Sequence, residues 1–243
     1  YKQSDVDIET AKVLNNLADV HVNMGEMQRA KEYHAKALEL REKSFDNNDH
    51  EDIAASLNNL GLVLCTLGQF DEATRLFKRA VNMCERLHVN DNGQTATSIA
   101  NLGNVYFDMG QYDKAKEYYS QSIDLYKSIK SVRNVAIVLN NLGSIYNLLG
   151  EYDVAKKYFL EALSLSNKYS DNLNAAIMLN NLGGVYYAWG QNDSASYYFD
   201  QSLYIIKQSG NESELAKLYN NRASIFSDAG EYEKALNFFL KAE

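Results

Sequence analysis

A block of about 40 residues recurs along the whole chain, and this periodicity constrains the fold more than any other feature of the sequence. Its marker is a pentapeptide of the form Leu-Asn-Asn-Leu-Gly, and exact or weaker copies begin at Leu14, Leu57, Ile99, Leu139, Leu179 and Tyr219. A glycine follows the last position of each copy by seven residues, which gives Gly25, Gly68, Gly110, Gly150, Gly190 and Gly230. Self-similarity at such a period indicates a repeat architecture, in which one supersecondary unit stacks on the next.

Each block predicts two helices joined by a tight turn. In the fourth block, Leu139 and Leu142 fall on one face of a helix, and Gly150 supplies the left-handed residue that ends it. A second helix follows, with an apolar face made of Tyr152, Ala155, Phe159, Ala162 and Leu163. A glycine inside a helix costs roughly 1 kcal/mol relative to alanine. Its recurrence, as at Gly143 with the small residue Ala155 in the second helix, indicates that the two helices approach closely.

The composition agrees with uninterrupted helix. The chain of 243 residues contains no proline, which would remove a backbone donor and clash with the preceding turn. Hydrophobic residues make up 46% of the chain, which is enough for a substantial core. No segment is apolar over the roughly 18 residues that a membrane span needs. We therefore predict an all-α fold, an α-solenoid in which antiparallel helix hairpins stack into a right-handed superhelix.

A single array is expected to fill residues 1–243. Its repeats are predicted at approximately residues 8–45, 51–88, 94–130, 134–170, 174–210 and 214–243, the last of them truncated. The start of the chain parallels residues 206–209, which predicts that residues 1–5 are the tail of a preceding repeat. We therefore expect a fragment of a longer array. Because the chain begins with Tyr1 rather than Met, a removed leader or an upstream domain also stays open.

The residues at fixed places in the block resemble the tetratricopeptide repeat (TPR) over essentially the whole chain. The resemblance rests on leucine or a small residue at position four, Leu-Gly at seven and eight, tyrosine at eleven, alanine at twenty and twenty-seven, and an aromatic residue at twenty-four. The period is longer than the usual 34 residues, and the closing proline is missing. This pattern is similar to the long-repeat branch of kinesin light chains, cell-polarity adaptors and bacterial signalling and peptide-receptor proteins. The resemblance implies a concave groove, lined by the first helices, that binds an extended peptide or a short helix.

Asparagine at position six is the main candidate for function, and it occurs in every block as Asn16, Asn59, Asn101, Asn141, Asn181 and Asn221. Asparagine is a poor helix former, so helix stability does not explain this recurrence. Its amide offers a donor and an acceptor, which suits a peptide backbone. The resemblance implies a ladder of asparagines that grips the main chain of a ligand. The alternatives are a ladder that bonds neighbouring helices, or solvated polar residues inherited with the repeat.

Further candidates lie at neighbouring positions of the same stripe. Position five carries Asn58, Asn140 and Asn180, which are candidates either for the groove or for bonds between repeats. Position nine carries Asn104, and position twelve carries Phe107 and Tyr187. These two aromatic residues are expected either to anchor a side chain of the ligand or to pack on the next hairpin.

Charge and residue content argue against several other functions. The net charge of −8 disfavours a direct nucleic-acid binder and docking on an anionic membrane, and it fits a neutral or basic polypeptide partner better. Cys65 and Cys84 show no metal-ligand spacing, so free thiols in a reducing, cytoplasmic compartment are expected. Four histidines (His21, His34, His50 and His88) form no metal-binding motif, and no phosphate-binding glycine loop occurs. We expect no cofactor, no metal site and no enzymatic activity.

Three functions are therefore considered. The first is a protein-interaction module that binds a peptide through the asparagine ladder. The second is the sensory or regulatory part of a larger signalling protein, such as a histidine kinase, a cyclase or a transcription regulator. The third is a self-assembly scaffold, in which exposed ends of the array associate with another copy.

Overall fold

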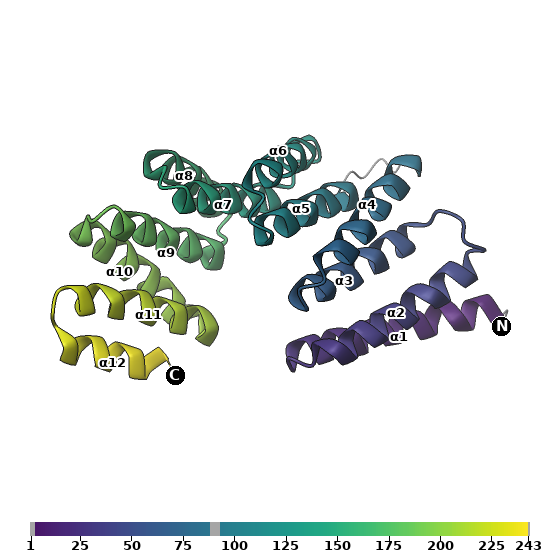
Figure 1. Cartoon of the computed structure of the whole chain (residues 1–243), viewed down its shortest axis with the longest axis horizontal. Coiled ribbons are helices and arrows are strands. Elements are labelled where there is room, and N and C mark those ends of the chain that lie inside the picture. The colour runs from purple at the N-terminus through teal and green to yellow at the C-terminus, as the bar shows by residue number, and fades with distance from the viewer. Residues whose placement is uncertain (1–2, 88–92, 243) are drawn as a thin grey trace. The chain divides into compact units, whose positions relative to one another are not determined.

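The computed structural model describes residues 3–87 and 93–242, and this part of the chain is all-α (Figure 1). Contacts between Cα atoms divide the chain into two compact units, the N-terminal unit (residues 1–131) and the C-terminal unit (residues 132–243). The helices of the N-terminal unit are α1 (Gln3–Asn23), α2 (Met27–Ser44), α3 (Glu51–Thr66), α4 (Phe70–Arg86), α5 (Gly93–Asp108) and α6 (Tyr112–Ser128). Those of the C-terminal unit are α7 (Val132–Leu148), α8 (Tyr152–Lys168), α9 (Asn172–Ala188), α10 (Asn192–Ser209), α11 (Glu212–Asp228) and α12 (Tyr232–Ala242).

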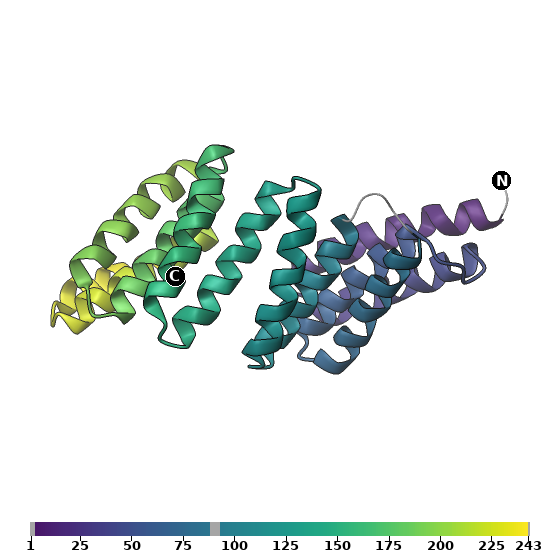
Figure 2. The ribbon, with the colours of Figure 1, turned by 90° about the horizontal axis from the view of Figure 1, so that it is seen from above.

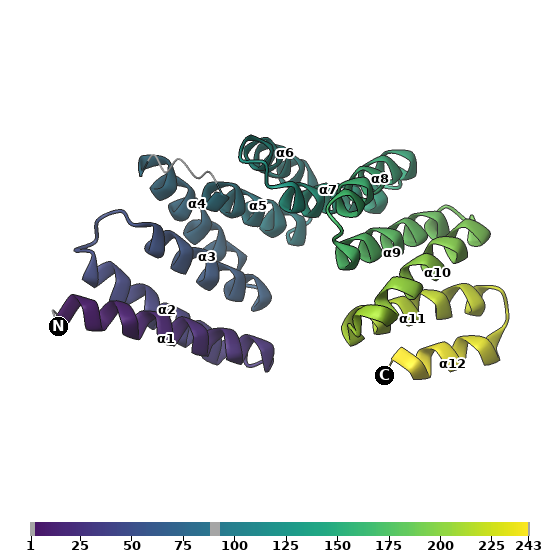
Figure 3. The same cartoon turned by 180° about the vertical axis from the view of Figure 1, so that it is seen from behind.

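Each unit is a stack of helix hairpins. An odd-numbered helix packs most extensively on the even-numbered helix that follows it, which gives the hairpins α1–α2 to α11–α12. Within a unit, the second helix of one hairpin packs on the first helix of the next. First helices of neighbouring hairpins also touch in three cases, α3 with α5, α7 with α9, and α9 with α11. The same hairpin order can be followed within each unit from above and from behind (Figure 2, Figure 3). The predicted all-α solenoid of helix hairpins is confirmed for these units.

The turn inside each hairpin depends on a glycine in the left-handed region. Gly150 has a φ of 76°, and its N–H donates to the carbonyl of Asn147 at 3.1 Å. The next residue, Glu151, donates to the carbonyl of Tyr146 at 2.8 Å, so the end of α7 is capped by a Schellman-type arrangement. The equivalent glycines have φ values between 70° and 77°. Glycine alone adopts this conformation without steric cost, so the recurring residue fixes where each first helix ends.

The two helices of a hairpin meet where an aromatic ring lies against the glycine of the pentapeptide. The four pairs are Gly61 with Phe77, Gly103 with Tyr119, Gly143 with Phe159, and Gly183 with Phe199. A Cβ atom added to these glycines would lie 2.5 to 2.9 Å from the nearest ring atom, which is closer than carbon atoms pack. The close approach expected from the sequence is therefore present, and the group that fills it is the buried ring at position twenty-four.

The first and last hairpins depart from this pattern. Alanine replaces the glycine at Ala18 and Ala223, and the ring positions are His34 and Phe239. His34 is buried, whereas 43% of Phe239 is exposed. Arg222 takes the place of the core leucine in the last hairpin, where it pairs with Asp200 of α10 and lies over the ring of Phe238.

The start of the chain differs from the expectation that residues 1–5 end a preceding helix. Residues 3–5 instead belong to α1, which continues without a break to Asn23. The physical reason is that the stretch from Gln3 to Asn23 contains no glycine or proline, so nothing in it ends a helix before the turn at Gly25. Tyr1 and Lys2 lie outside the described residues, and the repeat boundaries themselves stay a prediction.

The glycine contacts predict opposite effects for two adjacent substitutions. Gly183→Ala places a methyl group against the buried ring of Phe199 and should destabilise the chain by about 1–3 kcal/mol. In Gly184→Ala the new methyl group meets nothing within 4 Å, so this variant should gain up to about 1 kcal/mol from helix propensity. Thermal unfolding followed by circular dichroism checks both, and equal effects of the two substitutions would contradict the packing described.

Candidate functional site

The C-terminal unit presents a row of at least partly exposed side chains along its first helices. Positions two, six and nine of α7, α9 and α11 define this row, which we name the first-helix face: Ile137, Asn141, Ser144, Ile177, Asn181, Gly184, Lys217, Asn221 and Ser224. Residues spaced by four and then three lie on one side of a helix. All nine are at least partly exposed, and α7 touches α9 as α9 touches α11. The face is therefore a continuous surface across three hairpins.

Asparagines at positions five and six hydrogen-bond across neighbouring hairpins in this unit. Nδ2 of Asn181 donates to Oδ1 of Asn140 at 2.6 Å. In the next pair of hairpins, Nδ2 of Asn221 donates to Oδ1 of Asn180 at 2.9 Å. We name each such bond an amide rung. Of the alternatives considered for the asparagines, bonding between neighbouring helices is thus present in the C-terminal unit, and contact of the same side chains with a peptide stays a prediction.

The N-terminal unit uses the equivalent asparagines differently. Nδ2 of Asn58 donates to Oγ of Ser98 at 2.8 Å, and Ser98 in turn donates to the carbonyl of Gln94 at 2.9 Å. Oδ1 of Asn58 and Nδ2 of Asn101 are both buried and have no hydrogen-bond partner among the described residues. These are the acceptor and the donor that form a rung in the other unit. Asn58 and Asn101 therefore form no amide rung between α3 and α5.

The residue at position three correlates with this difference. Serine stands there in α3 and α5, as Ser56 and Ser98, and each hydroxyl binds a polar group of the preceding hairpin. In α9 and α11 the position is occupied by the apolar residues Met178 and Leu218, and there the asparagines bond each other. At Ser98 the hydroxyl thus engages the preceding asparagine, Asn58, whereas the hydroxyl of Ser56 engages Arg41. Ser98 was not among the predicted residues, although it is a polar residue at a repeat position that is mostly apolar.

The first hairpin holds its position-five asparagine in a buried polar cluster. The amide of Asn15 lies 2.9 Å from Nδ1 of His34 and faces the guanidinium group of Arg41. Burial lowers the pKa of His34, so its neutral ring accepts the amide hydrogen. Arg41 also donates to Oγ of Ser56 at 2.6 Å, which ties α2 to α3. In the same hairpin Asn16 is exposed, so it is available on the surface of α1.

Two further predicted residues, Asn104 and Phe107, each contact a side chain of their own hairpin. Asn104 accepts a hydrogen bond of 2.7 Å from the hydroxyl of Tyr119 in its own hairpin. The ring of Phe107 packs on Tyr112, with their centroids 5.9 Å apart. The two other predicted residues of the N-terminal unit, Asn59 and Asn101, are half-buried and buried, respectively.

Tyr187 links two hairpins of the C-terminal unit. Its hydroxyl donates to Oδ2 of Asp228, so α9 and α11 are joined beside the first-helix face. This hydrogen bond raises the pKa of Tyr187, since the phenol must keep its proton to donate. Asp228 was not among the predicted residues. The only sequence signal for it was its hydrogen-bond partner, Tyr187, at position twelve. Tyr187 thus contacts the next hairpin through its hydroxyl, and its role as an anchor for a side chain of the ligand stays a prediction.

The described titratable groups include a thiol, Cys65, whose pKa is shifted upward. Burial raises the pKa of the Cys65 thiol to about 11, and the carboxylate of Asp108 adds to the shift. A nucleophilic thiol requires a shift in the opposite direction. Within the described ranges no group of three or more His, Cys, Asp or Glu side chains is placed to hold a metal ion. The described helices also include none that is long and apolar enough to cross a membrane, and His88 lies outside the described residues.

The amide rung predicts energetic coupling between two residues 41 positions apart. Asn140→Ala and Asn181→Ala should each lower the free energy of unfolding, and a double-mutant cycle should give a coupling of about 0.5–1.5 kcal/mol. Asn140→Ala combined with Asn220→Ala is the control, because Asn220 has the same repeat position in the last hairpin and forms no rung in the described structure. Additive effects in the first pair, measured by urea unfolding, would rule out the rung.

The raised pKa of Cys65 predicts slow alkylation. Relative to an ordinary thiol pKa of 9.0, a value of about 11 lowers the thiolate population at pH 8 by roughly a hundredfold. Iodoacetamide should therefore modify Cys65 in the native chain about a hundred times more slowly than in guanidinium chloride. Mass spectrometry of the digested chain resolves Cys65 from Cys84. Equal rates in the two states would show that the thiol is neither buried nor shifted.

Comparison with known families gives matches along most of the chain. A sequence model of the tetratricopeptide repeat matches residues 9–86, 52–128 and 134–208, and a second model of the same repeat matches residues 216–243. No curated protein matches the chain by sequence.

Several solved structures have a similar fold. BtubC (BKLC) from P. vanneervenii superposes with a TM-score of 0.69 at 20% identity, covering 100% of this chain and 90% of its own. A putative kinesin light chain with nearly identical TPR-like repeats, from Podospora anserina, gives 0.66 at 19% identity, with 82% and 95% covered. A Rap protein complexed with competence and sporulation factor gives 0.76 at 13% identity, with 96% and 74% covered. At these identities the likeness concerns the fold.

Proposed function

Because the chain belongs to the tetratricopeptide repeat family, we propose that it is a protein-interaction module that binds an extended peptide on the first-helix face. The observation that carries the proposal is the row of partly exposed amides at Asn141, Asn181 and Asn221. The three lie on consecutive first helices that touch, so one ligand strand running across the helices meets all of them.

The amide rungs support this role rather than compete with it. In Asn181 the rung uses one of the two Nδ2 hydrogens, and an asparagine amide has a second hydrogen and two acceptor lone pairs. A peptide in extended conformation presents N–H and C=O groups along its length, which are the complementary partners. Because the rung fixes the orientation of the amide before a ligand arrives, less conformational entropy is lost on binding.

The other residues of the face suit a main chain that lies close to the helices. Position nine carries Ser144, Gly184 and Ser224, which are all small. A Cβ atom added to Gly184 meets nothing within 4 Å, so the surface at this point is open. Ile137 and Ile177 flank the asparagines and offer partly exposed apolar surface to side chains of the ligand. In this arrangement the asparagines supply affinity through the main chain of the ligand, and the isoleucines supply selectivity through its side chains.

Charge and fold likeness give further support. The net charge of −8 favours a neutral or basic partner, since oppositely charged molecules associate faster. The Rap protein of similar fold was solved with competence and sporulation factor bound to it. We extend peptide binding to this chain by analogy of fold, and the identity of the ligand is a matter for the experiment below.

The test is peptide selection on phage followed by affinity measurement on matched variants. Random peptides captured by the wild-type chain should bind Gly184→Leu at least tenfold more weakly, because the new side chain stands where the ligand main chain lies. Ser164→Leu is the control, since it places the same side chain on the exposed surface of α8. Both should keep wild-type helicity.

Two outcomes would contradict the proposal. Captured peptides that bind Gly184→Leu as tightly as wild type would place their site away from the first-helix face. Equal losses in Gly184→Leu and Ser164→Leu would show a general effect of surface leucine rather than a blocked site.

A further inference from the structure

The fourth hairpin contains a hollow of about 380 Å³ at the end opposite its glycine turn. The start of α7, the end of α8 and the turn into α9 surround it, all within the C-terminal unit. Its lining includes Arg133, Ala136, Leu165, Ser166, Tyr169 and Asp171. Pockets of a few hundred cubic ångströms with converging polar groups are typical of small-molecule sites. The hollow is therefore a candidate binding site, and it shares no residue with the first-helix face.

The hollow lies beside a small residue at a repeat position that otherwise carries larger side chains. Ser166 follows the turn glycine of its hairpin, Gly150, by sixteen residues. The residues at the same distance from the turn glycine in other hairpins are Arg41, Cys84, Tyr126 and Ile206, and all of them are buried. Serine has a smaller side chain than each of these four, which accounts for the space that is left at this point of the fourth hairpin.

The hydroxyl of Ser166 is buried without a hydrogen-bond partner. Ser166 is 4% exposed, and its Oγ atom bonds no other group among the described residues. At the same repeat position the hydroxyl of Tyr126 lies 2.9 Å from Oγ1 of Thr97, and Arg41 donates to Ser56. A buried hydroxyl with no partner costs free energy. Because Ser166 lines the hollow, rotation of its side chain brings Oγ within reach of a ligand that supplies the missing partner.

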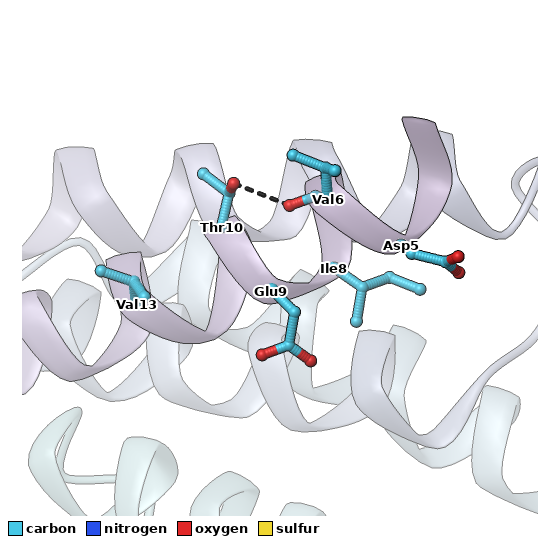
Figure 4. A pocket seen from close by; sticks show the side chains of 6 residues that line it. All are labelled: Asp5, Val6, Ile8, Glu9, Thr10 and Val13. Atoms are coloured by element: carbon cyan, nitrogen blue, oxygen red, sulfur yellow. Dashed lines mark hydrogen bonds between the residues drawn. The ribbon is translucent and has the colours of Figure 1, made fainter. Parts of the chain in front are cut away.

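A larger hollow, of about 710 Å³, lies against α1 and differs in this respect. Figure 4 shows the residues that line it, and the hydroxyl of Thr10 already donates to the carbonyl of Val6 at 2.7 Å. Thr10, Asp5 and Glu9 are exposed, so water satisfies their polar groups without a ligand. The hollow beside Ser166 is therefore the stronger candidate.

The charged groups of the hollow beside Ser166 favour a neutral ligand. Nε of Arg133 lies 2.9 Å from Oδ2 of Asp171, so a donor-only group and an acceptor-only group stand side by side. An anion in the hollow would meet the carboxylate, and a cation would meet the guanidinium group. A hydroxyl both donates and accepts, so neighbouring hydroxyls on one ligand can bond both groups.

The remaining lining suits the carbon skeleton of a compact ring. Leu165 and Ala136 supply apolar surface, and the ring of Tyr169 is 55% exposed beside them. A polyhydroxylated ring presents hydroxyls around its rim and C–H groups on its faces. Its rim therefore fits the polar groups of the hollow, and its faces fit the apolar ones.

We propose that the hollow beside Ser166 binds a neutral monosaccharide or cyclic polyol. Ser166, Arg133 and Asp171 bond its hydroxyls, and Leu165 and Tyr169 contact its C–H face. The site lies away from the first-helix face, and the proposal does not rest on peptide binding.

Saturation-transfer difference NMR with a fixed set of probes tests the ligand class. The neutral probes are glucose, galactose, mannose and myo-inositol, and the charged probes are glucuronate, galacturonate, glucosamine and galactosamine. At least one neutral probe should bind with a Kd in the millimolar range or tighter. Each charged probe should bind at least tenfold more weakly than the best neutral one, because it meets a like charge at Asp171 or Arg133.

Three variants test the place of binding. Ser166→Ile introduces the residue that the next hairpin has at this position, Ile206, so it should fill the hollow, abolish binding and leave the unfolding temperature unchanged or higher. Ser166→Ala keeps the hollow and removes the hydroxyl, so it should weaken binding roughly three- to tenfold. The control is Ser164→Ile, which places the same side chain on the exposed surface of α8 and should bind like wild type.

Four results would each overturn the proposal: no binding of any neutral probe, tighter binding of a charged probe, full binding by folded Ser166→Ile, or an equal loss in Ser164→Ile. Circular dichroism verifies the fold of every variant, and if Ser166→Ile does not fold, unchanged binding by Ser166→Ala decides against the proposal. Since none of these substitutions lies on the first-helix face, capture of peptides by Ser166→Ala tests the proposed function independently.

Discussion

The contact between a helical glycine and a buried ring is the constraint on which the hairpins depend. Glycine inside a helix costs roughly 1 kcal/mol, and the chain accepts this cost in four successive hairpins. In return the ring of the second helix reaches the backbone of the first, as Phe159 does at Gly143. This contact of the ring with the backbone sets the distance between the two helices. That distance in turn determines which side chains of the first helix stay at the surface.

Much of the fold could be predicted from the sequence because helix ends are local features. A glycine such as Gly150 ends a helix through its own backbone conformation, and no distant residue is needed to recognise it. The start of α1 was harder to predict. The similarity of the first residues to residues 206–209 predicted a helix end there, whereas the stretch from Gln3 to Asn23 contains no glycine or proline and forms one helix. Internal resemblance between repeats is a weaker guide to an element than its own residues.

The candidate site could be predicted only in part. The asparagines were recognisable because they recur, but their partners depend on side chains about 40 residues away. Asn58 bonds Ser98, whereas Asn140 accepts from Asn181, although the two asparagines have the same repeat position. The sequence contains both partners, yet the choice between them follows from packing at position three. The recurrence of asparagine therefore predicted the position of the polar row, but not the hydrogen bonds that its amides form.

The serine at position three has a consequence for how such arrays diversify. In the N-terminal unit Ser98 engages the preceding asparagine, and in the C-terminal unit the apolar Met178 leaves the asparagines to each other. Exchange of a hydroxyl for an aliphatic group at this buried point redirects an amide without altering the asparagine itself. Duplicated blocks can thus acquire different hydrogen bonds between hairpins through one buried residue, which makes the core a source of variation among repeats that share the same asparagines.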